Sequence, residues 1–191
     1  MKLPRIILAS ASPRRSELLK ELELNFDVIP ADVEEIAPVH LSPREICLVN
    51  AHRKARFVAR KYPDALVIGA DTIVCLGRKI FGKPVDITEA RRTLEALSGK
   101  THEVVTGVCL MEIGARREKL FAVSTTVTFH RLISGRVREY VKRVNTLDKA
   151  GAYAIQEHGD MIIDKIKGSH SNVVGLPLER LRKELRDWNF I

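Results

Sequence analysis

The sequence predicts an α/β fold with a mixed β-sheet flanked by helices. Apolar strand segments alternate with amphipathic helical segments along most of the chain. Residues 65–76 are apolar on both faces, which is typical of a buried central strand. Residues 104–111 and 121–129 read as a strand pair around Gly114, which we expect to be antiparallel. With 191 residues, we expect a single domain over residues 1–191, bent into two lobes around a central cleft.

The first half of the chain is expected to form three strands and two helices. The first helix places Leu18, Leu19 and Leu22 on one side. The second begins at Ser42-Pro43-Arg44-Glu45, a capping box with Pro at the first helical position. These elements are expected at residues 5–9, 13–24, 26–29, 43–61 and 65–76.

The second half continues the alternation. A helix begins at Asp86, with Ile87, Ala90 and Leu94 at helical spacing, and ends at Ser98-Gly99, which is a common C-terminal stop. The elements expected in this half lie at residues 86–97, 104–111, 121–129, 135–143, 161–166 and 177–188.

Composition limits the classes of protein that remain. The net charge of +8 could serve a nucleic-acid surface or an active site for a highly charged anion. The basic residues form separate groups with interleaved acids, so we expect most of them on solvated helix faces, and nucleic-acid binding is disfavoured. Cys47, Cys75 and Cys109 are widely spaced and odd in number, as in reduced core cysteines and unlike a disulfide framework or zinc site. Ile6 to Ala9 is too short for a signal-peptide core, and no segment has the apolar length of a membrane span. We therefore expect a soluble, cytoplasmic protein.

A strand-to-helix junction near the N-terminus predicts an anion site. The apolar run Ile6 to Ala9 leads to Ser12, a favourable N-cap, and to Pro13, which suits the first helical position. Helix N-terminal N–H groups and guanidinium groups both favour phosphate, so Arg14 and Arg15 here indicate phosphate binding. The alternative is a plain connection with two solvated arginines.

A set of carboxylates and cations indicates metal-assisted phosphate chemistry. Asp71 follows the central apolar run, where an isolated carboxylate is costly unless a cation, a metal or hydrogen bonds compensate it. With Glu35 it offers hard oxygen ligands that favour Mg²⁺ or Mn²⁺, and Lys54 and Lys83 add positive charge. A carboxylate can also deprotonate an attacking water. The plainer alternative is that Asp71 caps a turn and the other side chains are solvated.

Other chemistries lack their signatures. The chain has no Gly-x-x-x-x-Gly-Lys-Ser/Thr loop and no Gly-x-Gly-x-x-Gly motif, which disfavours a kinase or a Rossmann protein. Ser12 and Cys75 have no evident base partner, so a nucleophilic hydrolase is also disfavoured.

In this order, the motifs resemble the Maf family of nucleotide pyrophosphatases from Leu8 to Leu178. The resemblance rests on seven segments, namely Leu8–Arg15, Gly69–Thr72, Gly82–Pro84, Leu97–His102, Thr106–Val108, Asp148–Gln156 and Val174–Leu178. The family implies an α/β fold with a long bent sheet and a metal-dependent enzyme. Such an enzyme splits a nucleoside triphosphate between its α- and β-phosphates, giving a monophosphate and pyrophosphate.

Carried over by position, the resemblance implies roles for individual residues. Asp71 matches the catalytic carboxylate that accepts a proton from water. The implied catalytic residues are Asp71, Glu35, Lys54 and Lys83, and the implied phosphate-binding residues are Ser10 and Arg15. The implied cofactor is a divalent cation, Mg²⁺, Mn²⁺ or Co²⁺, with Glu35 and Asp71 as ligands.

Three positions indicate the substrate. Arg14, Thr72 and Gln156 match the subgroup that prefers dTTP, UTP and modified pyrimidine nucleotides. The Gln156 amide could pair with the N3–H and O4 edge of uracil or thymine, although a flipped amide would also accept cytosine. A second subgroup, which acts on 7-methyl-GTP, differs at Arg14 and in the Asp71-Thr72 pair and is the alternative.

The resemblance leaves further alternatives. The family name also suggests a regulatory protein that acts on septum formation or binds nucleic acid. Asp148 and Lys149 either pair and shape the loop that presents Gln156, or contact phosphate. Glu157 stands where many family members carry Gly and could alter the rim of the pocket. A homodimer is common in the family, and residues 188–191 offer an apolar patch.

Overall fold

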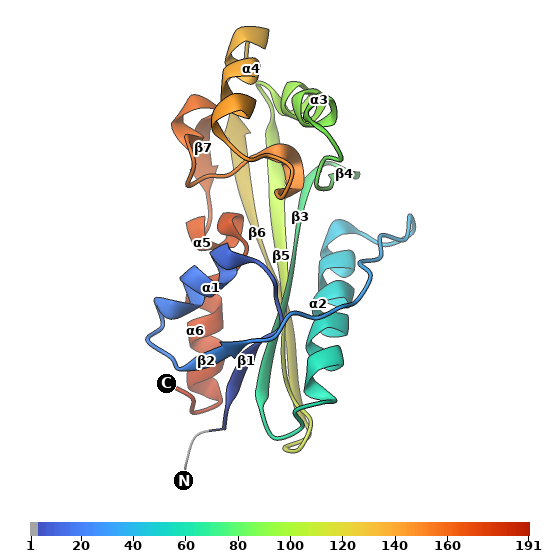
Figure 1. The fold of residues 1–191 in the computed structure, drawn as a ribbon, viewed down its shortest axis with the longest axis vertical. Coiled ribbons are helices and arrows are strands. Elements are labelled where there is room, and N and C mark those ends of the chain that lie inside the picture. The colour runs from blue at the N-terminus through green and yellow to red at the C-terminus, as the bar shows by residue number, and fades with distance from the viewer. Residues whose placement is uncertain (1–3) are drawn as a thin grey trace. The chain divides into compact units, whose positions relative to one another are not determined.

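The computed structural model describes residues 4–191 and has the expected α/β architecture (Figure 1). These residues form six α-helices and seven β-strands. The chain divides into two compact units. The first unit comprises the residues up to Asp71, residues 106–123 and residues 175–191, and the second comprises residues 72–105 and 124–174. The expected pair of lobes is therefore present, and the cleft stays a prediction.

The strands form a mixed sheet in the order β2-β1-β3-β5-β6-β7, with β4 paired to β3 outside that path. β1 pairs in parallel with β2 and with β3, whereas the β3–β4 and β6–β7 pairs are antiparallel. The strands are β1 (Ile6–Leu8), β2 (Phe26–Val28), β3 (Leu66–Leu76), β4 (Lys79–Phe81), β5 (Thr101–Glu112), β6 (Arg117–Phe129) and β7 (Ile163–Lys167). Strands β3, β5 and β6 each contribute residues to both units.

The first unit contains helices α1 (Pro13–Lys20), α2 (Pro43–Ala59) and α6 (Leu178–Asp187). α1 connects β1 to β2 and α2 connects β2 to β3, as parallel strands require a crossover. The predicted capping box is confirmed, because Ser42 Oγ accepts from the Glu45 N–H and the Glu45 carboxylate accepts from the Ser42 N–H. In Figure 1 the strands of this unit run between α2 on one side and α1 and α6 on the other.

Two glycines allow α2 to pack closely on the strands of the first unit. A Cβ on Gly69 of β3 would lie 2.4 Å from the carbonyl oxygen of Ala51, and one on Gly107 of β5 would lie 2.5 Å from the carbonyl carbon of Cys47. Both distances are shorter than a real Cβ contact, so any larger residue would push the helix away. The close approach brings the polar side chains of α2 within reach of β3.

The second unit contains α3 (Ile87–Leu97), α4 (Ser134–Arg143), the short α5 (His170–Val174) and two 3₁₀ turns at residues 150–152 and 159–161. Asp86 caps α3 by accepting from the Glu89 N–H at 2.7 Å. The core of this unit is built from large apolar side chains that include Leu94, Leu97, Phe129, Tyr140 and Ile162.

Most predicted elements are present with boundaries shifted by a few residues. The first helix was expected to reach residue 24 but ends at Lys20, where the chain turns with Glu23 in the left-handed conformation (φ 56°). β4, α5 and the 3₁₀ turns were not predicted, because segments of three to five residues are too short to show a period. Ser12 is the N-cap as predicted, but its side chain makes no capping hydrogen bond.

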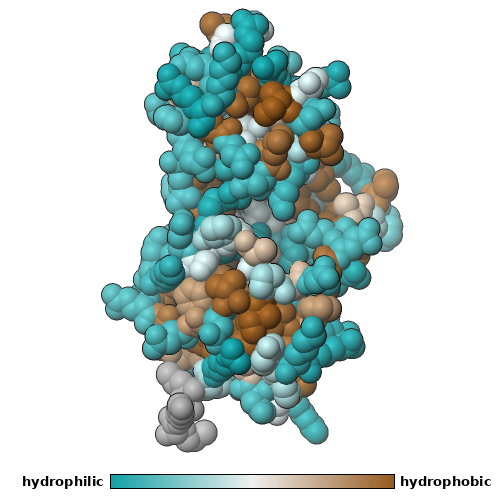
Figure 2. Space-filling view, viewed as in Figure 1, coloured by the Kyte–Doolittle hydropathy of each residue, from teal (hydrophilic) through white to brown (hydrophobic). Residues whose placement is uncertain are grey.

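The face of the molecule drawn in Figure 2 is mostly hydrophilic. Figure 2 shows separate apolar areas on the viewed face. The most exposed large apolar residues among residues 4–191 are Val39, Val85 and Ile133. All three cysteines are buried thiols outside disulfides, as predicted. Residues 4–191 contain no helix with the length and apolar character needed to cross a bilayer.

The C-terminal residues pack largely within the chain itself. Phe190 is 3% exposed, and the guanidinium group of Arg117 lies 5.5 Å from its ring centroid and 4.8 Å from that of Trp188. Ile191 is 43% exposed. Most of the apolar patch expected at the surface is therefore used internally, and the homodimer stays a prediction.

Candidate active site

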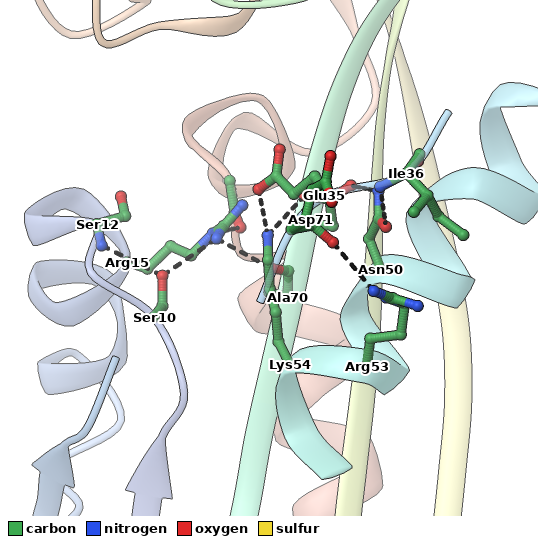
Figure 3. Close-up of polar contacts among 12 residues, drawn as sticks. Ser10, Ser12, Arg15, Glu35, Ile36, Asn50, Arg53, Lys54, Ala70 and Asp71 are labelled. Carbon is green, nitrogen blue, oxygen red and sulfur yellow. Dashed lines mark hydrogen bonds and ion pairs between the residues drawn. The ribbon is translucent and has the colours of Figure 1, made fainter. Parts of the chain in front are cut away.

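Five of the predicted site residues gather in the first unit, near the end of β1 (Figure 3). β1 ends opposite Ile68 of β3, whose carbonyl accepts from the Ala9 N–H at 2.8 Å. The carbonyl of Ala70 lies beyond the end of β1 and accepts instead from Arg15 Nη1 at 3.0 Å and from Lys54 Nζ at 3.4 Å. The carboxyl ends of parallel strands are where α/β sheets place their sites. The residues brought together are Ser10, Arg15, Glu35, Lys54 and Asp71.

Lys54 connects the two predicted carboxylates. Its Nζ lies 2.8 Å from Asp71 Oδ1 and 2.6 Å from Glu35 Oε1. The side chains of Lys54 and Asp71 are 11% and 5% exposed, whereas that of Glu35 is 52% exposed. Asp71 lies inside β3 and is compensated by a cation, so the alternative that it caps a turn is wrong. The ammonium group of Lys54 therefore compensates the charge of the buried Asp71 carboxylate.

Asn50 also belongs to this cluster, and the sequence did not single it out. Its Nδ2 donates to Asp71 Oδ2 at 3.1 Å and to the Ile36 carbonyl at 3.0 Å. Its Oδ1 accepts from the Ile36 N–H at 3.0 Å. Asn50 lies one helical turn before Lys54, and a polar amide among the small apolar residues of α2 is the sequence signal that could have revealed it.

Arg15 turns into the protein. Its Nε donates to the Gly175 carbonyl at 2.8 Å, and its Nη1 donates to Ser10 Oγ at 3.1 Å. Burial of the guanidinium group lowers the pKa of Arg15 from its ordinary value, and the charges of Asp71 and Glu35 oppose that shift. The interpretation of Arg15 as a solvated surface residue is therefore wrong. Phosphate binding by Ser10 and Arg15 stays a prediction.

The other predicted residues lie elsewhere. Arg14 is a partly buried residue of α1 in the first unit. Thr72, Lys83 and Gln156 belong to the second unit, where Thr72 is partly buried in β3 and the other two are exposed in loops. Their part in the site stays a prediction.

A buried lysine organises the loop that carries Gln156. Lys149 Nζ donates to the Asn145 carbonyl at 2.7 Å and to Asp148 Oδ1 at 2.9 Å, and it lies 3.1 Å from Glu157 Oε1. The predicted pairing of Asp148 with Lys149 is therefore present. Glu157 joins the same cation directly after Gln156, so the ammonium group links both ends of this loop.

Glu35 and Asp71 are oxygen donors of the kind that a divalent cation prefers, so their chemistry fits the metal that the resemblance implies. Glu35 and Asp71 both accept from one ammonium group, so their charges converge on one point. Among residues 4–191 no group of three or more His, Cys, Asp or Glu side chains is arranged to hold a metal. Mg²⁺ is commonly held by one or two carboxylates and completes its octahedron with water and substrate phosphates. Two carboxylates therefore suffice for this type of site.

Together, the mixed sheet and the carboxylate–lysine cluster beside the end of β1 define an α/β protein with its candidate site at the carboxyl end of a parallel strand. The Maf-like protein family model matches residues 5–188, and the chain belongs to this family.

Curated relatives match over their full length. A dTTP/UTP pyrophosphatase of Carboxydothermus hydrogenoformans is 45% identical over 97% of this chain and 100% of the relative. Another dTTP/UTP pyrophosphatase, from Akkermansia muciniphila, is 46% identical over 95% of each chain. Among solved structures, a HAM1 protein from Coxiella burnetii has a TM-score of 0.56 at 18% identity, covering 97% of this chain and 100% of that one. This last likeness concerns the fold alone.

Proposed function

We propose that this chain is a nucleoside triphosphate pyrophosphatase that hydrolyses dTTP and UTP to the monophosphate and pyrophosphate. The full-length relatives that bear this name support the reaction and the substrate. The observation that carries the chemistry is the Asp71 carboxylate, almost fully buried and held by Lys54 and Asn50.

Asp71 is the proposed proton acceptor for the attacking water. A carboxylate has about four lone-pair sites, and Lys54 and Asn50 each use one, so capacity remains to accept a hydrogen bond from water. Their two bonds fix the orientation of the carboxylate before substrate binds. Proton transfer to Asp71 as water attacks phosphorus would then need no rearrangement of the site.

Cations neutralise the charge of the triphosphate. Lys54 in the first unit and Lys83 in the second are the proposed side-chain contributors. A divalent cation held by Glu35 and Asp71 would, when bound, neutralise phosphate charge in the transition state. Glu35 suits contact with an incoming substrate because its side chain is half exposed.

Base selection is assigned to Arg14, Thr72 and Gln156. A Gln amide offers one donor and one acceptor, which matches the N3–H and O4 edge of uracil and thymine. The same edge occurs in uracil derivatives modified at C5. The proposed role in the cell is therefore the removal of surplus or modified pyrimidine triphosphates.

The first test is pyrophosphate release from dTTP, UTP, 5-methyl-UTP, CTP, GTP and 7-methyl-GTP, with Mg²⁺ or Mn²⁺ and with a chelator. Metal-dependent turnover of the uracil and thymine compounds is expected. Turnover of 7-methyl-GTP alone would retain the reaction and overturn the substrate. No turnover of any triphosphate would overturn the proposed function in favour of a regulatory protein.

Asp71→Asn tests the proposed role of the carboxylate in the reaction. It keeps the size of the side chain and removes the basic carboxylate, so kcat is expected to fall about 10²–10⁴-fold. An Asn variant with near-normal kcat would contradict the role of Asp71.

A further inference from the structure

Asn50 makes three hydrogen bonds from a position that is 3% exposed. Two reach the backbone of Ile36, and the third reaches the carboxylate of Asp71 (Figure 3). The pattern permits one amide orientation, because the Ile36 N–H requires an acceptor while the Ile36 carbonyl and the carboxylate require donors. Asn50 is therefore bonded at both ends of its amide.

These bonds close a loop of contacts around the two carboxylates. Ile36 directly follows Glu35, whose carboxylate is joined to Asp71 through Lys54. Asn50 and Lys54 lie one turn apart on α2, so the segment carrying Glu35 is tied to Asp71 twice from the same helix face. The first connection, which we call the Lys54 tie, runs through the ion pairs of Lys54 with Glu35 and Asp71. The second, the Asn50 tie, runs through the hydrogen bonds of Asn50 to the backbone of Ile36 and to Asp71.

The two ties differ in what substrate binding can do to them. The Lys54 tie ends on the half-exposed carboxylate of Glu35, so a phosphate can compete with Glu35 for the ammonium group and a cation can compete with Lys54 for the carboxylate. The Asn50 tie is buried and ends on a backbone amide and carbonyl, which no anionic substrate replaces. Asn50 can therefore keep the Glu35 segment and Asp71 in fixed relation while Lys54 and Glu35 exchange partners.

We propose that Asn50 is a positioning residue, which orients the Asp71 carboxylate and holds the Glu35 segment beside it. This inference rests on the proposed function for its consequence in turnover. It assigns Asn50 no contact with the substrate and no part in proton transfer. Hydrogen-bond partners that orient metal-ligating side chains, the proposed role of Asp71, typically contribute about 10–100-fold to metal affinity or activity.

The test compares Asn50→Leu with the wild type. Leu has a similar volume and none of the three hydrogen bonds, so kcat for UTP is expected to fall about 10–100-fold while KM changes by less than about threefold. Asn50→Ala serves if the Leu variant does not fold. Unchanged kcat in a folded variant would overturn the positioning role.

A structural role alone is excluded by two controls. Asn172→Leu removes a second fully buried asparagine, whose Nδ2 donates to the Val104 carbonyl and to Thr125 Oγ1, and should lower stability while retaining kcat. In the Asp71→Asn background, Asn50→Leu should lower kcat by no more than about twofold, because it acts through the group already removed. Equal fold-losses in both backgrounds would contradict the inference.

Amide hydrogen exchange tests the tie without turnover. The Ile36 N–H should be protected in the wild type and lose protection in Asn50→Leu, while the amides of α2 keep theirs. This arm separates the two proposals. A wild type without turnover overturns the proposed function, whereas an Ile36 amide that exchanges equally fast in both proteins overturns the role of Asn50.

Discussion

The ammonium nitrogen of Lys54 lies 2.8 Å from Oδ1 of Asp71, and the two side chains are 11% and 5% exposed. Two buried charges compensate each other as a pair. If one of them is removed by substitution, the other stays buried without its partner, which destabilises the folded protein. Glu35 shares the same ammonium group but is half exposed, so water can compensate its charge. The pair therefore has a role in stability that is separable from its proposed role in turnover.

Lys54→Met should lower the free energy of unfolding by about 3–5 kcal/mol, because Asp71 is left charged and buried. Adding Asp71→Asn should restore part of this loss, since the isolated charge is removed. Urea denaturation of the two single variants and the double variant at pH 7 measures both effects. Pyrophosphate release should fall in all three.

Arg143→Met provides the control. Arg143 pairs with Glu139 on the surface of α4, where both side chains are about half exposed. Such pairs contribute about 0–1 kcal/mol, so this variant should unfold close to the wild type. Equal losses for Lys54→Met and Arg143→Met would show that burial of the Lys54 pair is energetically unimportant.

Arg15→Lys should lower the free energy of unfolding by about 1–3 kcal/mol, because one ammonium group cannot reach the acceptors of Ser10, Ala70 and Gly175 together. Thermal unfolding measures this loss, and KM for UTP measured beside it separates structure from phosphate binding. A raised KM with unchanged stability would assign Arg15 to the substrate and not to the framework.

Lys149→Met should cost less than Lys54→Met, at about 1–2 kcal/mol. Its carboxylate partners Asp148 and Glu157 are 49% and 42% exposed, so both remain solvated after the lysine is removed. The hydrogen bond from Lys149 Nζ to the Asn145 carbonyl is the third interaction lost. Denaturation of both lysine variants under one condition decides the order, and a larger loss at Lys149 would contradict this account.

The parts of the fold that could be predicted are those with a local signal. The capping box at Ser42 and Glu45 is readable because four consecutive residues carry the whole interaction. The strand Leu66–Leu76 is readable because burial on both faces needs an unbroken apolar run. The strand-to-helix junction before Pro13 has the same local character, and its position was correct.

The contacts of the site depend on tertiary packing and had no such signal. Asn50 meets Asp71 because Gly69 and Gly107 let α2 approach the sheet, and the sequence does not state which helix crosses which strand. Arg15 was expected to bind phosphate, with a solvated position as the alternative, and its inward turn could not be read from the sequence because it depends on the carbonyl of Ala70 lying past the end of β1. Both outcomes depend on how elements from distant parts of the sequence pack together, which is information that a single segment does not contain.

His102 should make the stability of the second unit depend on pH. Its Nε2 lies 2.9 Å from Tyr153 Oη, and its ring packs edge-on against Phe129 and Tyr153. Burial lowers the pKa of His102 from 6.5 to about 4, because the charged ring would be desolvated. Between these two values the unfolded chain binds a proton that the folded protein does not. The contribution is therefore fully present above pH 6.5 and is lost as the pH falls to about 4.

The difference between the two pKa values of His102 corresponds to about 3 kcal/mol. His102→Phe keeps an aromatic ring and removes the titrating group, so its free energy of unfolding should fall less than that of the wild type between pH 7 and pH 4. Since carboxylates titrate over the same range, the quantity to measure is the difference between the two proteins in urea denaturation at each pH. His130→Phe is the control, because the side chain of His130 is 38% exposed. Parallel pH profiles for the wild type and His102→Phe would show that His102 accepts its proton without loss of the fold.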